Sequence, residues 1–192
     1  MKFNAFGVQF YISFTFAAYI TLLLLIDKTG LIIPVLISNA VHELGHATAL
    51  NIVKCKIIKL SLTPGGCIIT VPPYKNKKQE VFVSLMGPLY NMAAAFVFTI
   101  IWLLLDLHGC FVAAVINMGL GAFNLLPIKG LDAGNIFYIL LYDKAPNSCK
   151  VISFIFSFLV CTFFIAGFIV YGVNTSFIIV AVYLFCCAVF KI

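Results

Sequence analysis

The sequence His42-Glu43-Leu44-Gly45-His46 lies inside an apolar run that is long enough to cross a membrane. Between Leu31 and Val53 these two histidines and one glutamate are the only ionisable side chains. Ionisable groups at bilayer depth are costly and by default indicate a functional site. On a helix the two imidazoles, four residues apart, leave the same face. This spacing is typical of a pair of zinc ligands, with Glu43 beside them as a general base.

The composition agrees with a membrane environment. The chain has 192 residues, is 64% hydrophobic and 9% charged, and has a mean hydropathy of +1.16. A soluble domain of this size cannot cover so much apolar surface, so we expect one integral-membrane domain over residues 1–192. Seven cysteines without a CxxC pair indicate small apolar side chains rather than disulfides or a thiolate metal site. The basic balance is explained by membrane orientation, and no nucleic-acid partner is expected.

Hydropathy predicts an all-α polytopic membrane protein with about six transmembrane helices. The first apolar segment ends without a small-residue cleavage pattern, so we expect an uncleaved anchor. The segment Leu125–Leu141 starts near Pro127 and is expected to re-enter the membrane or lie along it. The six predicted spans are 6–26, 31–53, 80–105, 109–126, 150–172 and 175–190.

The connection Lys54–Gln79 is too polar for a span. Two β-prone runs flank Pro64-Gly65-Gly66, which predicts a membrane-associated β-hairpin between spans two and three. An extended substrate can pair with the edge of such a hairpin, and a peptide bond inside a helix needs some unwinding before cleavage. Gly65 and Gly66 are therefore candidate substrate contacts, and a plain surface hairpin is the alternative.

The lysines predict the orientation. With the amino terminus inside, the outside segments hold Lys28 alone, and the other eleven of the twelve lysines lie inside. The positive-inside rule then places both termini in the cytosol and the two histidines in the cytosolic half of span two. Span four is expected to end on the cytosolic side, so the segment Leu125–Asp132 should lie on the same side as the histidines. The cluster Lys75–Lys78 fits this topology signal, with binding of an anionic lipid or acidic partner as the alternative.

A catalytic zinc ion usually takes three protein ligands, so the two histidines need a third. His108 falls in an outside turn, and Glu80 follows the lysine cluster. Asp132 lies where Pro127 and Gly130 allow the backbone to unwind on the cytosolic side. We predict Asp132 as the third ligand of one zinc ion per chain. A solvated loop aspartate is the alternative.

Glu43 is expected to act on protons rather than bind the metal. Asn91 follows Gly87-Pro88 by one helical turn and can bond across helices, or the segment can be a purely structural kink. Asn124 can hold the substrate or the oxyanion, or it can cap a helix. We take Asn91 and Asn124 as candidate substrate or transition-state contacts.

At this point the sequence resembles the site-2 protease family of intramembrane zinc metalloproteases, peptidase family M50. The resemblance covers spans two to four in the family's order. The usual aspartate motif ends Asp-Gly-Gly, whereas this chain has Asp132-Ala133-Gly134. The matching segments are His-Glu-Leu-Gly-His at 42–46, Pro-Gly-Gly at 64–66, Gly-Pro-Leu-Tyr-Asn at 87–91 and Asn-Leu-Leu-Pro with Leu-Asp-Ala-Gly at 124–134.

The resemblance implies that His42, His46 and Asp132 bind zinc and that Glu43 is the catalytic base. It implies a membrane-embedded or membrane-tethered regulatory protein as substrate, a multi-pass protein of a bacterial cell membrane, and inhibitory membrane partners. We expect no PDZ domain and no carboxy-terminal regulatory domain. This minimal form is most similar to the stage IV sporulation protein FB branch, which cleaves the pro-form of a sigma factor.

Two other classes remain open from the residues. A membrane metal-binding or transport protein would use the two histidines and Asp132 as a transit site, with little need for Glu43. A zinc peptidase with a soluble-facing site would use a glutamate as third ligand.

Overall fold

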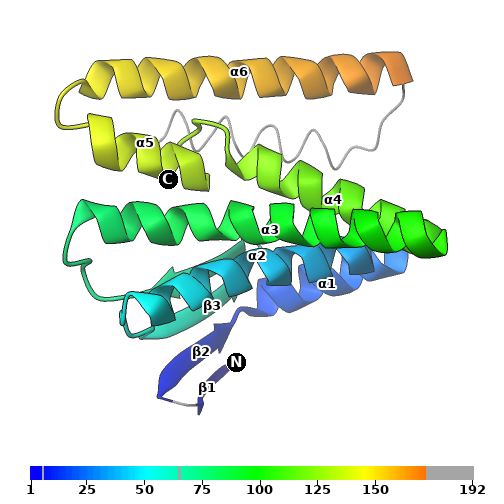
Figure 1. Cartoon of the computed structure of the whole chain (residues 1–192), viewed down its shortest axis with the longest axis horizontal. Coiled ribbons are helices and arrows are strands. Elements are labelled where there is room, and N and C mark those ends of the chain that lie inside the picture. Colours follow the sequence, from blue (N-terminus) through cyan, green and yellow to red (C-terminus); the bar gives the residue numbers. More distant parts are fainter. Residues whose placement is uncertain (6, 65, 172–192) are drawn as a thin grey trace. The chain divides into compact units, whose positions relative to one another are not determined.

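The structure, a computed structural model, describes residues 1–5, 7–64 and 66–171 (Figure 1). Its contacts divide the chain into two compact units, Met1–Gly121 and Ala122–Ile192. The predicted span at 175–190 and the candidate contact Gly65 lie outside the described residues.

The first unit contains helices whose ends are fixed by polar side chains. Ser13 caps the first helix by accepting from the Phe16 amide, and Asn76 caps the third by accepting from Gln79. Before the second helix, the Asp27 carboxylate accepts from the backbone amides of Thr29, Gly30 and Ile32, which satisfies donors at that end. The helices are α1 (Phe14–Ile26), α2 (Ile32–Ile52), α3 (Lys77–Leu105) and α4 (His108–Asn124), whose last residues belong to the second unit.

Helices α2 and α3 pack closely because glycines lie at their contact. A Cβ on Gly45 of α2 would approach the Met86 carbonyl carbon to 2.9 Å and the Tyr90 Cβ to 3.0 Å. Buried Ala49, Leu50 and Val83 form the apolar core beside this contact. The close approach brings polar groups of α3 within reach of the histidines on α2.

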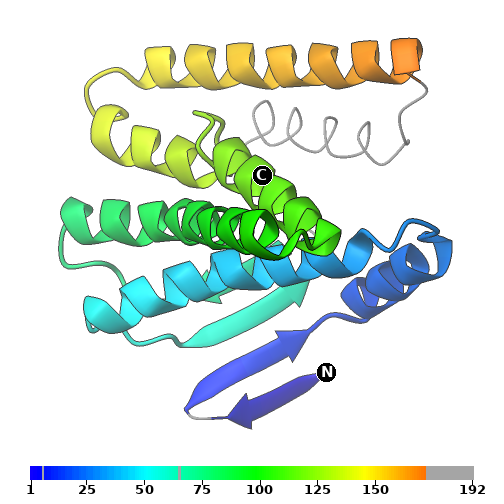
Figure 2. The same ribbon diagram turned by 45° about the vertical axis from the view of Figure 1, so that its right-hand side comes forward.

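A four-stranded sheet adjoins these helices (Figures 1 and 2). Strand order follows the sequence; β1–β2 and β3–β4 are antiparallel, and β2–β3 is parallel. Ile69 of β4 packs against the Ala49, Leu50 and Val83 cluster, so one face of the sheet covers the helix pair. The strands are β1 (Lys2–Ala5), β2 (Val8–Ile12), β3 (Lys59–Thr63) and β4 (Gly66–Thr70).

Strands β3 and β4 form an antiparallel hairpin, while its association with the membrane between spans two and three stays a prediction. The predicted helical span 6–26 is wrong in its first part. Val8–Ile12 is strand β2, and α1 begins only at Phe14. Gly7, with φ of 74°, takes the left-handed conformation that the β1–β2 turn requires. Partners on both sides satisfy the backbone of β2, and one of them, β3, lies some fifty residues further along the chain. The 13 residues of α1 are fewer than the roughly 20 needed to cross a bilayer.

The second unit holds α5 (Asp132–Leu141) and α6 (Pro146–Tyr171), joined to α4 by an irregular segment. Ile128 and Leu131 of that segment are buried against Phe156 and Val160 of α6. Gly134 is required in α5 because a Cβ there would collide with the Ile128 carbonyl group. This packing fixes the turn that places Asp132 at the first residue of α5.

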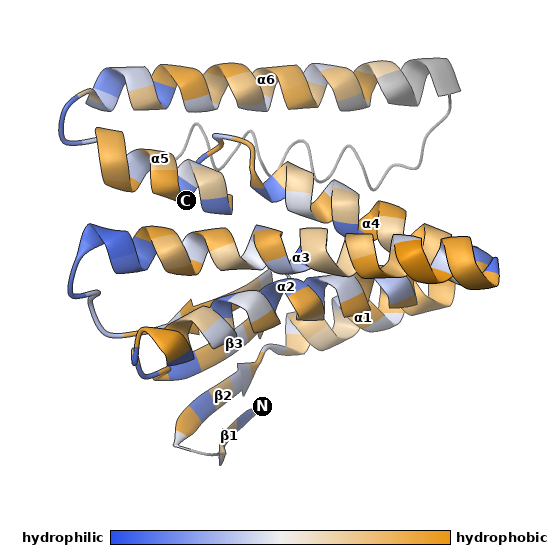
Figure 3. Cartoon of the chain, viewed as in Figure 1, coloured by the Kyte–Doolittle hydropathy of each residue, from blue (hydrophilic) through white to orange (hydrophobic). Residues whose placement is uncertain are grey.

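Two described helices are long and apolar enough to cross a membrane, namely α3 and the Pro146–Phe163 part of α6. Only 17% of the most apolar stretch of each is buried, so their apolar side chains face outward, as in lipid, rather than into a protein core. Figure 3 shows hydrophobic residues over most of α3, beyond its hydrophilic first turns, and over much of the coloured part of α6. A mostly helical membrane protein with a small mixed sheet agrees with these surfaces. The count of about six spans stays a prediction.

Candidate metal centre

His42 and His46 lie one turn apart on α2 and face each other. Their rings are nearly perpendicular, with centroids 4.8 Å apart, and their Nε2 atoms are separated by 3.2 Å. His42 is 7% exposed and His46 is half-buried. The structure therefore brings together the two imidazoles that the sequence selected.

Groups on α3 hold the other nitrogen of each ring. His46 Nδ1 lies 2.9 Å from the Val83 carbonyl oxygen, and His42 Nδ1 lies 3.2 Å from Asn91 Oδ1. A carbonyl oxygen only accepts hydrogen bonds, so Nδ1 of His46 carries the proton. Its Nε2 then presents a lone pair toward His42.

The residues fit a zinc ion. Two nitrogens bound to one tetrahedral zinc ion at about 2.0–2.1 Å would be about 3.3 Å apart, and the observed separation is 3.2 Å. An acceptor on Nδ1 is the usual way to fix the tautomer of a metal-binding histidine. Two converging lone pairs at this distance favour a cation between them.

Gly87 of α3 makes room for the rings. A Cβ at this position would collide with His46 Nε2 and would approach His46 Cε1 to 2.6 Å and His42 Cε1 to 2.8 Å. The Gly-Pro segment noted in the sequence therefore touches both imidazoles through its glycine, rather than acting only as a kink.

Glu43 follows His42 on α2 and is half-buried. Its side chain is hydrogen-bonded to the thiol of Cys67 on β4. Burial raises the pKa of Cys67 to about 12, and the negative charge and hydrogen bond of Glu43 add to the shift. The thiol is thus a neutral donor to the carboxylate. Treating all cysteines as small apolar residues missed this contact, and no local sequence signal points to it.

A buried chain of polar groups continues behind His42. Asn91, which is fully buried, donates from Nδ2 to the Ser38 carbonyl oxygen at 3.3 Å. Asn117 of α4 donates to Ser38 Oγ at 2.9 Å. Ser38 and Asn117 were not selected from the sequence, although Ser38 precedes His42 by one turn on the same helix face.

The remaining candidates belong to other elements of the chain. Asp132 and Asn124 belong to the second unit, Asp132 at the start of α5 and Asn124 at the end of α4. Gly66 opens strand β4 with φ of 117°, a left-handed value that favours glycine in the hairpin turn. An aspartate in the first turn of a helix is favoured by the helix dipole, which gives Asp132 a local structural role as well.

No family profile matches the chain. Zinc metalloprotease MJ0392 of Methanocaldococcus jannaschii is 29% identical over 119 residues, which are 59% of this chain and 35% of that protein. Stage IV sporulation protein FB of Bacillus subtilis is 29% identical over 113 residues, which are 55% of this chain and 38% of that protein. The match thus spans little more than a third of each relative's length.

The fold is similar to that of a solved protease. The site-2 protease from Methanocaldococcus jannaschii aligns with a TM-score of 0.68 and 22% sequence identity, covering 98% of this chain and 93% of that one. At this identity the likeness concerns the fold.

Proposed function

We propose that the chain is a member of the site-2 protease family and an intramembrane zinc metalloprotease, which its sequence relatives and its fold support. The observation that carries this proposal is the pair of Nε2 atoms 3.2 Å apart, each on a ring whose Nδ1 is held by α3. The neighbouring Glu43 supplies a base. A pair of metal-binding histidines without a neighbouring base would serve metal binding or metal transport equally well.

His42, His46 and Asp132 are proposed to hold one zinc ion per chain. Two imidazoles and one carboxylate are a common donor set for catalytic zinc. The proposal makes residues 1–192 one catalytic domain, because the ligands are divided between the two compact units.

The zinc ion and the residues of the chain would have different roles in peptide hydrolysis. Bound zinc would polarise the attacking water and the scissile carbonyl. Glu43 would accept a proton from that water and pass it to the leaving amine. The Cys67 thiol donates to the Glu43 carboxylate and so helps to hold this side chain in place.

Asn91 is proposed to position a ligand rather than to touch the substrate. The Ser38 carbonyl accepts from Nδ2 of Asn91, which fixes the amide orientation and turns Oδ1 toward His42. His42 Nδ1 must then be the donor in this pair. Asn91 therefore keeps the Nε2 lone pair of His42 directed toward the metal position.

The free edge of β4 is proposed to receive the substrate. In the sheet order β1-β2-β3-β4 this strand is terminal, so its outer edge can pair with an extended segment. Its Cys67 contacts the base, which puts a paired segment beside Glu43. Gly66 and Asn124 stay candidate contacts of that segment.

We propose that cleavage occurs near the cytosolic face of a bacterial cell membrane, with both termini in the cytosol. The lysine distribution supports this orientation. The substrate would be a membrane-associated regulatory protein, of which a pro-sigma factor in sporulation is the specific candidate. We also propose that membrane partners inhibit this protease.

The test compares the wild-type chain with Glu43→Gln in proteoliposomes. We expect about one zinc per chain in both proteins, and cleavage of a membrane-tethered substrate only in the wild type, because glutamine cannot take the proton. Full cleavage by Glu43→Gln would contradict the proposed base. Zinc flux into liposomes, unaffected by Glu43→Gln, would favour the transport alternative.

A further inference from the structure

The outer face of the sheet carries a basic and polar surface that the proteolytic site does not use. Side chains alternate along a strand, and the register aligns them in two rows across the strands. Lys2, Tyr11 and Ser61 form one row, and Asn4, Gln9 and Lys59 form the other. The opposite face bears Phe3, Phe10, Leu60 and Ile69 in register, and Ile69 packs on the helix core.

Two ammonium groups contact the same aromatic ring on this polar face. Lys2 Nζ and Lys59 Nζ lie 5.8 and 5.2 Å from the centroid of the same Tyr11 ring. A cation–π contact holds each ammonium in place but leaves its positive charge uncompensated. The four strands contain neither aspartate nor glutamate. Two positive charges at one ring, without an acidic residue in the strands, favour an anion from outside.

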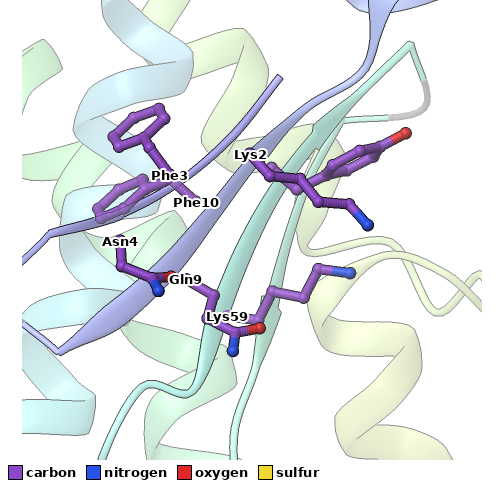
Figure 4. Close-up of a pocket in the computed structure, with 7 residues that line it drawn as sticks. Lys2, Phe3, Asn4, Gln9, Phe10 and Lys59 are labelled. Atoms are coloured by element: carbon purple, nitrogen blue, oxygen red, sulfur yellow. The ribbon is translucent and has the colours of Figure 1, made fainter.

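A cavity of about 300 Å³ lies at this position. Figure 4 shows Lys2 and Lys59 extending to one side of the strands and Phe3 and Phe10 to the other. Asn4 and Gln9 add amide groups that can donate to oxygen. The lining residues are Lys2, Phe3, Asn4, Gln9, Phe10, Tyr11 and Lys59.

We propose that this cavity binds a phosphate ester anion, and specifically the headgroup of an anionic phospholipid. Two lysines, two amides and a tyrosine provide the charge and donors that such a group needs. Phe3, 49% exposed, stacks on Phe10 with centroids 5.1 Å apart, which gives the same two strands an aromatic pair on the face opposite the lysines. A small sheet that carries both aromatic and basic side chains is typical of the membrane interface. This site is independent of the zinc site and of proteolysis.

Native mass spectrometry of the full detergent-purified chain tests the proposal. Phosphatidylglycerol, phosphatidylcholine and inorganic phosphate are offered separately. We expect phosphatidylglycerol to bind at least tenfold more tightly than phosphatidylcholine, and Lys2→Gln/Lys59→Gln to weaken its binding about 10- to 30-fold. The matched control Lys144→Gln/Lys150→Gln removes the same charge from the second unit and should leave binding within about twofold.

A second variant guards against misfolding. Asn4→Ala/Gln9→Ala keeps the charge and should weaken phosphatidylglycerol binding severalfold with an unchanged melting temperature. Equal binding of the two lipids, or equal weakening in the control, would overturn the site. Inorganic phosphate binding as tightly as phosphatidylglycerol would overturn the lipid as its occupant.

Discussion

Gly87 and His46 are in contact such that no side chain can stand at position 87. A Cβ there would approach His46 Cε1 to 2.6 Å, well inside van der Waals contact, and the Nε2 atom more closely still. The backbone of α3 thus forms one wall of the proposed metal position. The orientation of the two imidazole rings depends on the absence of a side chain at position 87.

Gly87→Ala should therefore displace the imidazoles. We expect zinc affinity to fall by tenfold or more, because the rings must turn or the helices must separate. Equilibrium dialysis of zinc measures this directly. Gly119→Ala on α4 is the matched control, since a Cβ there meets nothing within 4 Å. Equal zinc affinity in both variants would show that α3 is not a wall of the site.

Asn91→Leu removes the acceptor of His42 while keeping the number and branching of the side-chain heavy atoms. We expect zinc affinity to fall about 10- to 100-fold, as for other partners that orient metal-binding histidines. The visible spectrum of the cobalt-substituted protein should also change, which a purely structural role would not require. Asn117→Leu is the control, because Asn117 is equally buried and bonds Ser38 but not His42. Loss of zinc in Asn117→Leu alone would reverse the assignment.

Asp132→Asn tests the third ligand. A neutral amide is a poor zinc ligand, so zinc per chain should fall well below that of the wild type in dialysed protein. Asp143→Asn makes the same change in charge at an exposed position of the second unit and should retain zinc. Unchanged zinc in Asp132→Asn would exclude this ligand set while leaving His42 and His46 untested.

The Cys67 thiol should resist alkylation. A pKa of about 12 leaves its thiolate fraction at neutral pH about a thousandfold below that of a thiol at the ordinary value of 9.0. The rate with iodoacetamide, followed by peptide mass spectrometry, should still rise with each step from pH 7 to about 9.5. A plateau near pH 9 would contradict the raised pKa.

Glu43→Gln provides the comparison for this thiol. The substitution removes the charge that raises the Cys67 pKa but leaves the burial, so the pKa should fall without returning to 9.0. Alkylation of Cys67 should become faster, while the other cysteines of the same protein keep their rates. An unchanged rate at Cys67 would mean that Glu43 does not contact this thiol in solution.

Local patterns in the sequence were enough to predict the helices around the motif. The four-residue spacing of His42 and His46 fixes their common face on any helix, and Pro64 with Gly66 marks the turn between two strands. These features depend on neighbours within a few residues, so they can be read without knowing what packs against them.

Tertiary structure decided the rest. The apolar sequence of β2 does not distinguish a strand from a helix. Pairing with β3, which lies some fifty residues away, makes this segment a strand. Asn91, Gly87 and Cys67 gain their roles only where α3 and β4 pack on α2. The sequence alone determined which side chains can bind zinc, since that depends on their chemistry. The packing of distant segments decided which nitrogen faces the metal position, because only a neighbour in space can hold the other one.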